Sequence, residues 1–103
     1  MLQEGILNPA VNDLLSRIRH TNTLVIADWA FPYWKELEIV DLSLTKGIPL
    51  ITDLLGLLKD NFKVGRIWQA EEFLATNPEK IIANYNAKFN SFKGLNPEVE
   101  VTR

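Results

Sequence analysis

The sequence predicts a layered α/β/α fold with a mixed, mostly parallel sheet. Two observations lead to this prediction. Segments with helical spacing of apolar residues are interleaved with short strand-like segments, and one strand-like segment has no polar alternation. A strand without alternation is typical of a parallel or central strand that is covered on both faces. At 103 residues the chain can build one core, so we expect a single domain over residues 1–103.

Three segments are predicted to be helices. Asn8 and Pro9 are typical of a helix start, because an Asn side chain accepts a hydrogen bond from the first turn and Pro lacks a backbone donor. Helical spacing of apolar residues then continues to about residue 19. A second buried helix is expected over residues 50–61, and a third begins at Pro78.

Four segments are predicted to be strands, at residues 23–27, 36–42, 62–70 and 98–101. The first has no polar alternation, and the last alternates strictly between charged and apolar residues. In an α/β sheet, ligands generally bind at the carboxyl ends of the strands. The loop after the first predicted strand is therefore the expected position of a site.

His20 and Asp28 lie at the two ends of that first predicted strand, and an aromatic loop over residues 29–34 follows Asp28. An imidazole gains and loses a proton near neutral pH, which suits it to acid–base chemistry. A histidine at a helix end is also often a capping or surface residue. Asp28, in turn, is able to bind backbone amides of the next turn instead of a ligand. Both interpretations stay open for each residue.

The composition argues against several classes of function. A net charge of -2 gives no basic surface for nucleic acid. The chain has no cysteine and one histidine, so we expect neither a metal site nor a redox cofactor. Residues 1–5 show no basic stretch followed by an apolar run, so we expect no leader, and no segment approaches the roughly 18 apolar residues that span a bilayer. We therefore expect a cytoplasmic protein with no membrane partner.

Several short motifs resemble, in order and spacing, the family of ribose pyranases and fucose mutarotases. The resemblance covers roughly residues 5–73 well and the remainder loosely. The matching motifs are Gly5-Ile6-Leu7-Asn8, His20-Thr21, Leu24-Val25-Ile26-Ala27-Asp28, Pro32, Val40-Asp41-Leu42-Ser43-Leu44, Gly47-Ile48-Pro49 and Glu71-Glu72.

The resemblance implies interconversion of sugar ring forms without a cofactor, either pyranose with furanose for ribose or one anomer with the other for fucose. His20 matches the family's catalytic histidine and Asp28 its sugar-binding carboxylate, and Phe31 is expected to contact the sugar. The resemblance also implies a homo-oligomeric ring with pockets between subunits. The aromatic loop is then expected to serve mainly as a subunit interface.

The sequence departs from the family at several positions. Arg19 precedes His20 where glycine is usual, and the loop Asp28-Trp29-Ala30-Phe31-Pro32 replaces an Asp-Ala-Gly-Leu-Pro pattern. Its Phe-Pro pair is closer to the fucose branch. Family members also continue into a segment with a second histidine and a Tyr-x-Asn motif, so we expect a shortened member with weakened catalysis. The alternatives are a sugar-binding or regulatory module without catalysis, and a purely structural oligomer.

Overall fold

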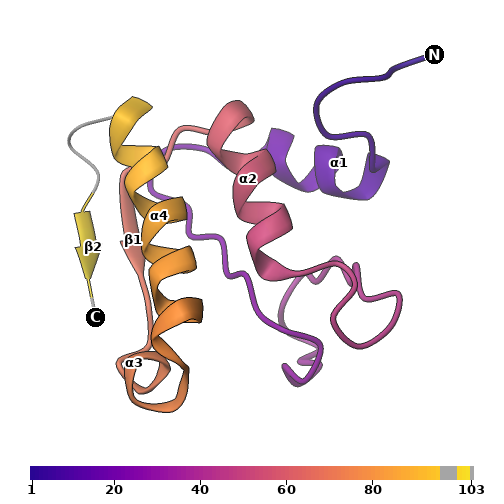
Figure 1. Ribbon diagram of the computed structural model, residues 1–103. Helices are drawn as coiled ribbons and strands as arrows, with labels where there is room; N and C mark the ends of the chain where they lie inside the picture. The colour runs from indigo at the N-terminus through magenta and orange to yellow at the C-terminus, as the bar shows by residue number, and fades with distance from the viewer. Residues whose placement is uncertain (96–99, 103) are drawn as a thin grey trace. The chain divides into compact units, whose positions relative to one another are not determined.

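The computed structural model describes residues 1–95 and 100–102 (Figure 1). The chain divides into two compact units, which we call the N-terminal unit (residues 1–54) and the C-terminal unit (residues 55–103). Helix α2 (Ile51–Asn61) begins in the first unit and ends in the second. Of the helices that the structure describes, none is both long and apolar enough to cross a membrane.

Helix α1 (Pro9–Arg17) is the one regular element that lies wholly within residues 1–54, all of which are described. Its start agrees with the sequence prediction, because the Asn8 side-chain oxygen accepts a hydrogen bond of 3.0 Å from the amide of Val11. Val11 is buried, and Leu14 and Leu15 of this helix are half-buried. The predicted helix is confirmed, although it ends two residues earlier than expected.

The predicted strands at residues 23–27 and 36–42 are wrong. Neither segment pairs with another strand among residues 1–95 and 100–102, where the one sheet joins two other segments. Val25 is 67% exposed, whereas its neighbours Leu24 and Ile26 are half-buried, so the first segment is covered on one face only. An apolar run favours extended backbone, but a strand also needs a partner that the run itself does not specify.

The C-terminal unit contains strands β1 (Arg66–Trp68) and β2 (Glu100–Thr102), which pair in parallel. Ile67 lies opposite Val101, and Gln69 continues the pairing by donating its amide to the Thr102 carbonyl at 2.9 Å. β1 overlaps the strand predicted at residues 62–70, and β2 overlaps the one predicted at residues 98–101. Residues 98 and 99 lie outside the described residues. The α/β fold class is confirmed.

Two helices follow β1 in the C-terminal unit. Helix α3 (Glu72–Thr76) is a single turn and a half that the sequence prediction did not include. Helix α4 (Glu79–Leu95) begins just after Pro78, as predicted, and is 17 residues long. The ring centroids of Phe73 in α3 and Tyr85 in α4 are 4.6 Å apart, so α3 packs against the first half of α4 (Figure 1).

Among the described residues of the C-terminal unit, the buried side chains come from α2 and α4. Leu55 and Leu58 of α2 are buried, as are Phe89 and Phe92 of α4. Each pair is three residues apart and therefore lies on one face of its helix. At Gly56, an added Cβ would stand 3.7 Å from the ammonium of Lys88, which shows that the two helices approach each other there.

Arg17 joins the end of α1 to the loop that contains Glu38. Its guanidinium donates two hydrogen bonds to the Glu38 carboxylate, one of them 2.8 Å long, and a third of 3.1 Å to Asp13. The hydrogen bond from Arg17 lowers the pKa of Glu38 and is the largest cause of that shift. Because all three side chains are largely exposed, water and salt screen the pairs, and we expect them to orient the loop more than they stabilise the fold.

The two leucines Leu57 and Leu58 give a matched test of the α2 interface. Leu58 is 3% exposed and Leu57 is 41% exposed on the same helix. Leu58→Ala leaves a cavity and should lower the free energy of unfolding by about 3 kcal/mol, whereas Leu57→Ala should cost less than about 1 kcal/mol. Urea unfolding followed by circular dichroism measures both, and equal losses would contradict the packing described.

The lowered pKa of Glu38 predicts how its interaction with Arg17 depends on pH. The interaction stabilises the folded chain above the ordinary glutamate pKa of 4.5 and is lost as the pH falls through the lower folded value. Arg17→Met should therefore raise the pKa of Glu38 toward 4.5. Carboxyl carbon chemical shifts measure this titration, with Arg19→Met as the control. An unchanged titration in Arg17→Met would show that the contact is absent in solution.

Candidate functional site

His20 lies in a tight turn three residues after the end of α1. The turn is closed twice: the Asn22 amide donates to the Arg19 carbonyl at 3.1 Å, and the Arg19 amide donates to the Asn22 side-chain oxygen at 2.8 Å. The imidazole is exposed and makes no hydrogen bond or ion pair with the residues that the structure describes. It does not cap α1, so both of its ring nitrogens are open to a ligand.

The backbone next to His20 has an uncommon conformation. Thr21 has a φ of 78°, in the left-handed region that glycine and asparagine tolerate better than a β-branched residue. Strained residues of this kind are stable only where the surrounding hydrogen bonds enforce them, and they occur often at functional sites. Sequence reasoning does not predict this feature, because threonine is not a residue that favours a left-handed turn.

Asp28 opens the turn that begins the aromatic loop. Its Oδ1 accepts a hydrogen bond of 2.9 Å from the amide of Ala30, and its carbonyl accepts one of 3.1 Å from Phe31. The interpretation that Asp28 binds the backbone of the next turn is therefore confirmed for one oxygen. Oδ2 makes no hydrogen bond with any described residue, so half of the carboxylate is free to accept one from a ligand.

The aromatic residues of the loop are exposed rather than packed within the N-terminal unit. The rings of Phe31 and Trp34 meet edge to face, with centroids 5.3 Å apart. The ammonium of Lys46, from a second turn, lies 5.9 Å from the ring centroid of Trp29. Phe31, the third predicted site residue, is therefore part of an open aromatic surface that begins directly after Asp28.

Asp41, which lies in one of the matching motifs, binds its own neighbourhood. Its Oδ1 accepts hydrogen bonds from both the amide and the hydroxyl of Ser43, and the amide bond is 2.9 Å long. The hydroxyl contact is the largest cause of a lowered pKa for Asp41. Because the shared oxygen is committed to this local turn, we assign Asp41 a structural role.

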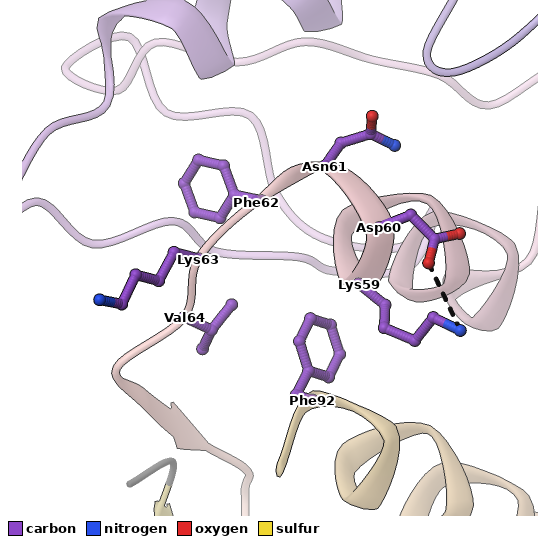
Figure 2. Close-up of a pocket in the computed structure, with 7 residues that line it drawn as sticks. All are labelled: Lys59, Asp60, Asn61, Phe62, Lys63, Val64 and Phe92. Carbon is purple, nitrogen blue, oxygen red and sulfur yellow. Dashed lines mark ion pairs between the residues drawn. The ribbon is translucent and has the colours of Figure 1, made fainter. Parts of the chain in front are cut away.

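Two hollows of the C-terminal unit are lined by other residues, and neither includes His20, Asp28 or Phe31. The larger one, of about 490 Å³, lies at the end of α2 and includes Phe62, Val64 and Phe92 (Figure 2). Lys59 and Lys63 also line it, but Figure 2 shows their ammonium groups extending to opposite sides, so they do not converge on one anion. Across residues 1–95 and 100–102, no three metal-binding side chains come together.

His20 and Asp28 thus stand at the two ends of one segment of the chain, and that segment is not a strand. Neither side chain forms a hydrogen bond with the other in the part of the chain that is described. The second unit's hollows include neither residue. The N-terminal unit therefore presents an exposed imidazole at one end of this segment, and a free carboxylate oxygen followed by an exposed aromatic loop at the other.

The chain is similar in sequence to proteins named D-ribose pyranase. It is 40% identical over 79 residues to a D-ribose pyranase of Geobacillus kaustophilus (strain HTA426), an alignment that covers 77% of this chain and 58% of that protein. A D-ribose pyranase of Escherichia coli O1:K1 / APEC is 34% identical over 79 residues, covering 77% of this chain and 57% of the relative. In sequence, the chain thus spans less than two thirds of the length of these relatives.

A comparison of folds also finds a similar protein, and this match covers more of the chain than the sequence alignments do. The solved structure described as Bacillus subtilis RbsD complexed with D-ribose matches with a TM-score of 0.75 and 26% identity, over 99% of this chain and 86% of that one. The model of the RbsD / FucU transport protein family matches residues 1–103. The chain therefore belongs to the RbsD / FucU family.

Proposed function

We propose that this protein interconverts ring forms or anomers of a monosaccharide of the ribose or fucose type, in the cytoplasm and without a cofactor. The observation that carries the proposal is His20, an exposed imidazole without a protein partner in the described structure, at one end of a segment whose other end bears the free oxygen of Asp28. Family membership and relatives named D-ribose pyranase support it. The net charge of -2 argues against a nucleic-acid partner.

The proposed reaction needs one group that both accepts and donates a proton. The neutral imidazole of His20 accepts the proton of the anomeric hydroxyl as the ring C–O bond breaks and the carbonyl forms. The resulting imidazolium returns that proton to the former ring oxygen, which becomes a hydroxyl. Ring closure reverses both transfers, so no oxidant, reductant or second substrate is required. Asp28 accepts a hydrogen bond from a sugar hydroxyl through Oδ2, and the Phe31 ring contacts the carbon skeleton.

We expect the catalytic effect to be modest. A positioned general acid–base contributes about 10² to 10⁴ in rate. His20 is exposed, and no described side chain orients its ring or excludes water from it. Since orientation and a dry site supply much of an enzyme's advantage, the rate enhancement should fall at or below the lower end of this range.

Saturation-transfer NMR of ribose and fucose measures the exchange of ring forms directly. The chain should accelerate exchange by no more than about 10² over buffer, and His20→Ala should return the rate to that of buffer. Asp28→Asn should weaken sugar binding while the folded spectrum is preserved. Acceleration that survives His20→Ala would contradict the assigned role of the imidazole.

A second candidate function is sugar binding without catalysis. The unoriented imidazole of His20 favours it, because binding needs only hydrogen bonds and an apolar face, whereas proton transfer needs alignment. The same experiment separates the two functions. Saturable binding of a sugar with exchange at the buffer rate would establish the binding module and reject the enzyme.

We also propose that the protein is a homo-oligomer whose subunits meet through the aromatic loop. Tyr33 and Trp34 are exposed in the loop, and the ring of Trp34 also packs edge to face on Phe31. Large exposed aromatic surface of this kind is typical of interfaces rather than of free monomer surface. A neighbouring subunit would also remove the site surface from water.

Sedimentation velocity at micromolar concentration tests the assembly. The unaltered chain should sediment as an oligomer, and Tyr33→Ser combined with Trp34→Ser should shift it to monomer, because the interface loses its aromatic contacts. Trp68→Ser, at an exposed tryptophan of the C-terminal unit, is the matched control and should leave the oligomer intact. A monomer in all three samples would contradict the proposed interface.

A further inference from the structure

Two tight turns of the N-terminal unit place Lys46 against Trp29. Lys46 lies at the tip of the turn from Thr45 to Ile48, in which the Ile48 amide donates to the Thr45 carbonyl at 3.0 Å and the Thr45 amide donates back at 3.3 Å. Gly47 has a φ of 81°, which the turn requires and glycine adopts without strain. The Lys46 ammonium is held 5.9 Å from the Trp29 ring centroid and forms no ion pair with a described residue.

Trp29 directly follows Asp28 in the other turn. The Asp28 carboxylate bends back to the amide of Ala30 and leaves Oδ2 free, while the indole of Trp29 emerges at the next position and is 61% exposed. A hydrogen-bond acceptor, a flat apolar face and a cationic donor therefore lie on two neighbouring turns. All three groups keep bonding capacity, since Lys46 forms no ion pair or hydrogen bond with a described residue and most of the indole is exposed.

This combination matches the chemistry of a neutral pyranose. A pyranose ring carries its hydroxyls around the edge and gathers axial C–H groups on its faces, so it needs polar groups at its rim and an aromatic plane below it. An anion would be repelled by the Asp28 carboxylate, and a cation by the Lys46 ammonium. A neutral polyhydroxylated ring uses both charges, because its hydroxyls donate to carboxylate oxygen and accept from ammonium.

We propose that Trp29 and Lys46 bind the sugar together with Asp28, with the Trp29 indole stacked on the pyranose face and the Lys46 ammonium donating to a ring hydroxyl. This inference rests on the proposed sugar function and extends it to two residues outside the predicted site. It also assigns different tasks within the aromatic loop. Trp29 contacts the sugar, whereas Tyr33 and Trp34 contact the neighbouring subunit.

The chain contains a matched control for the proposed stacking residue. Trp68 of β1 is 60% exposed and has a cation neighbour of its own, with the Arg66 guanidinium 5.7 Å from its ring centroid. Trp68 is as exposed as Trp29 and also has a cation beside its ring, although that cation is an arginine that pairs with Glu100. It lies in the C-terminal unit, away from Asp28 in the sequence. A general effect of losing an exposed tryptophan would therefore appear equally at both positions.

Dissociation constants for D-ribose and L-fucose, measured by NMR titration of the full chain, test the proposal. Trp29→Leu should weaken binding about five- to tenfold, Trp29→Phe should retain part of it, and Lys46→Met should weaken it about threefold. Trp68→Leu should leave the constants unchanged. Dispersed amide spectra and sedimentation of each variant confirm that fold and assembly are preserved, since the substituted side chains are exposed.

The outcomes separate this inference from the function on which it rests. Saturable sugar binding by the unaltered chain, with Trp29→Leu and Lys46→Met unchanged, would overturn the inference and leave the proposed function standing. Equal weakening by Trp29→Leu and Trp68→Leu would also overturn it. No binding of either sugar by the unaltered chain would reject the proposed function and the inference together.

Discussion

The scarcity of buried surface in the N-terminal unit governs the candidate site. Among residues 1–54, all of which the structure describes, Val11 is the one buried side chain. Packing therefore cannot fix the positions of His20, Asp28 and Trp29. Their backbone is fixed instead by hydrogen bonds closed within three or four residues, at Asn22 onto Arg19 and at Ala30 and Phe31 onto Asp28. The site is a set of local turns presented on an open surface.

This arrangement has a functional consequence. Turns closed by a few exposed hydrogen bonds open with little free energy, whereas the C-terminal unit buries Leu55, Leu58, Phe89 and Phe92. The proposed chemistry therefore depends on groups that gain their final order from a ligand or from a neighbouring subunit. The uncommitted carboxylate oxygen of Asp28 and the unpartnered imidazole of His20 fit that description, because each keeps its bonding capacity for such a partner.

The sequence predicts the long helices well, because their formation depends on interactions between residues that are close in the sequence. The helices at Pro9–Arg17, Ile51–Asn61 and Glu79–Leu95 were predicted from a cap, from apolar spacing and from proline, all of which act within a few residues. The strands at residues 23–27 and 36–42 were wrong because a strand requires a distant partner. The predicted strands that overlap β1 and β2 are confirmed, because these two segments pair with each other in parallel.

Only part of the candidate site's local structure is predictable from the sequence. The positions of His20 and Asp28 at the ends of one segment, and the competing role of Asp28 in its own turn, followed from the sequence. The left-handed Thr21 and the contact of Lys46 with Trp29 did not. The first depends on a backbone angle that threonine rarely adopts, and the second joins residues 17 positions apart through two turns. No periodic pattern encodes either feature.

In the proposed function His20 faces a bound monosaccharide, and the chain's histidine content makes this contact easy to test. Because His20 is the single histidine of the sequence, its ring protons give one unambiguous set of NMR signals. Titration with ribose and with fucose to high millimolar concentration should shift these signals along a saturable curve, and Asp28→Asn should displace that curve to higher sugar concentration. Imidazole signals that stay fixed throughout both titrations would contradict the account.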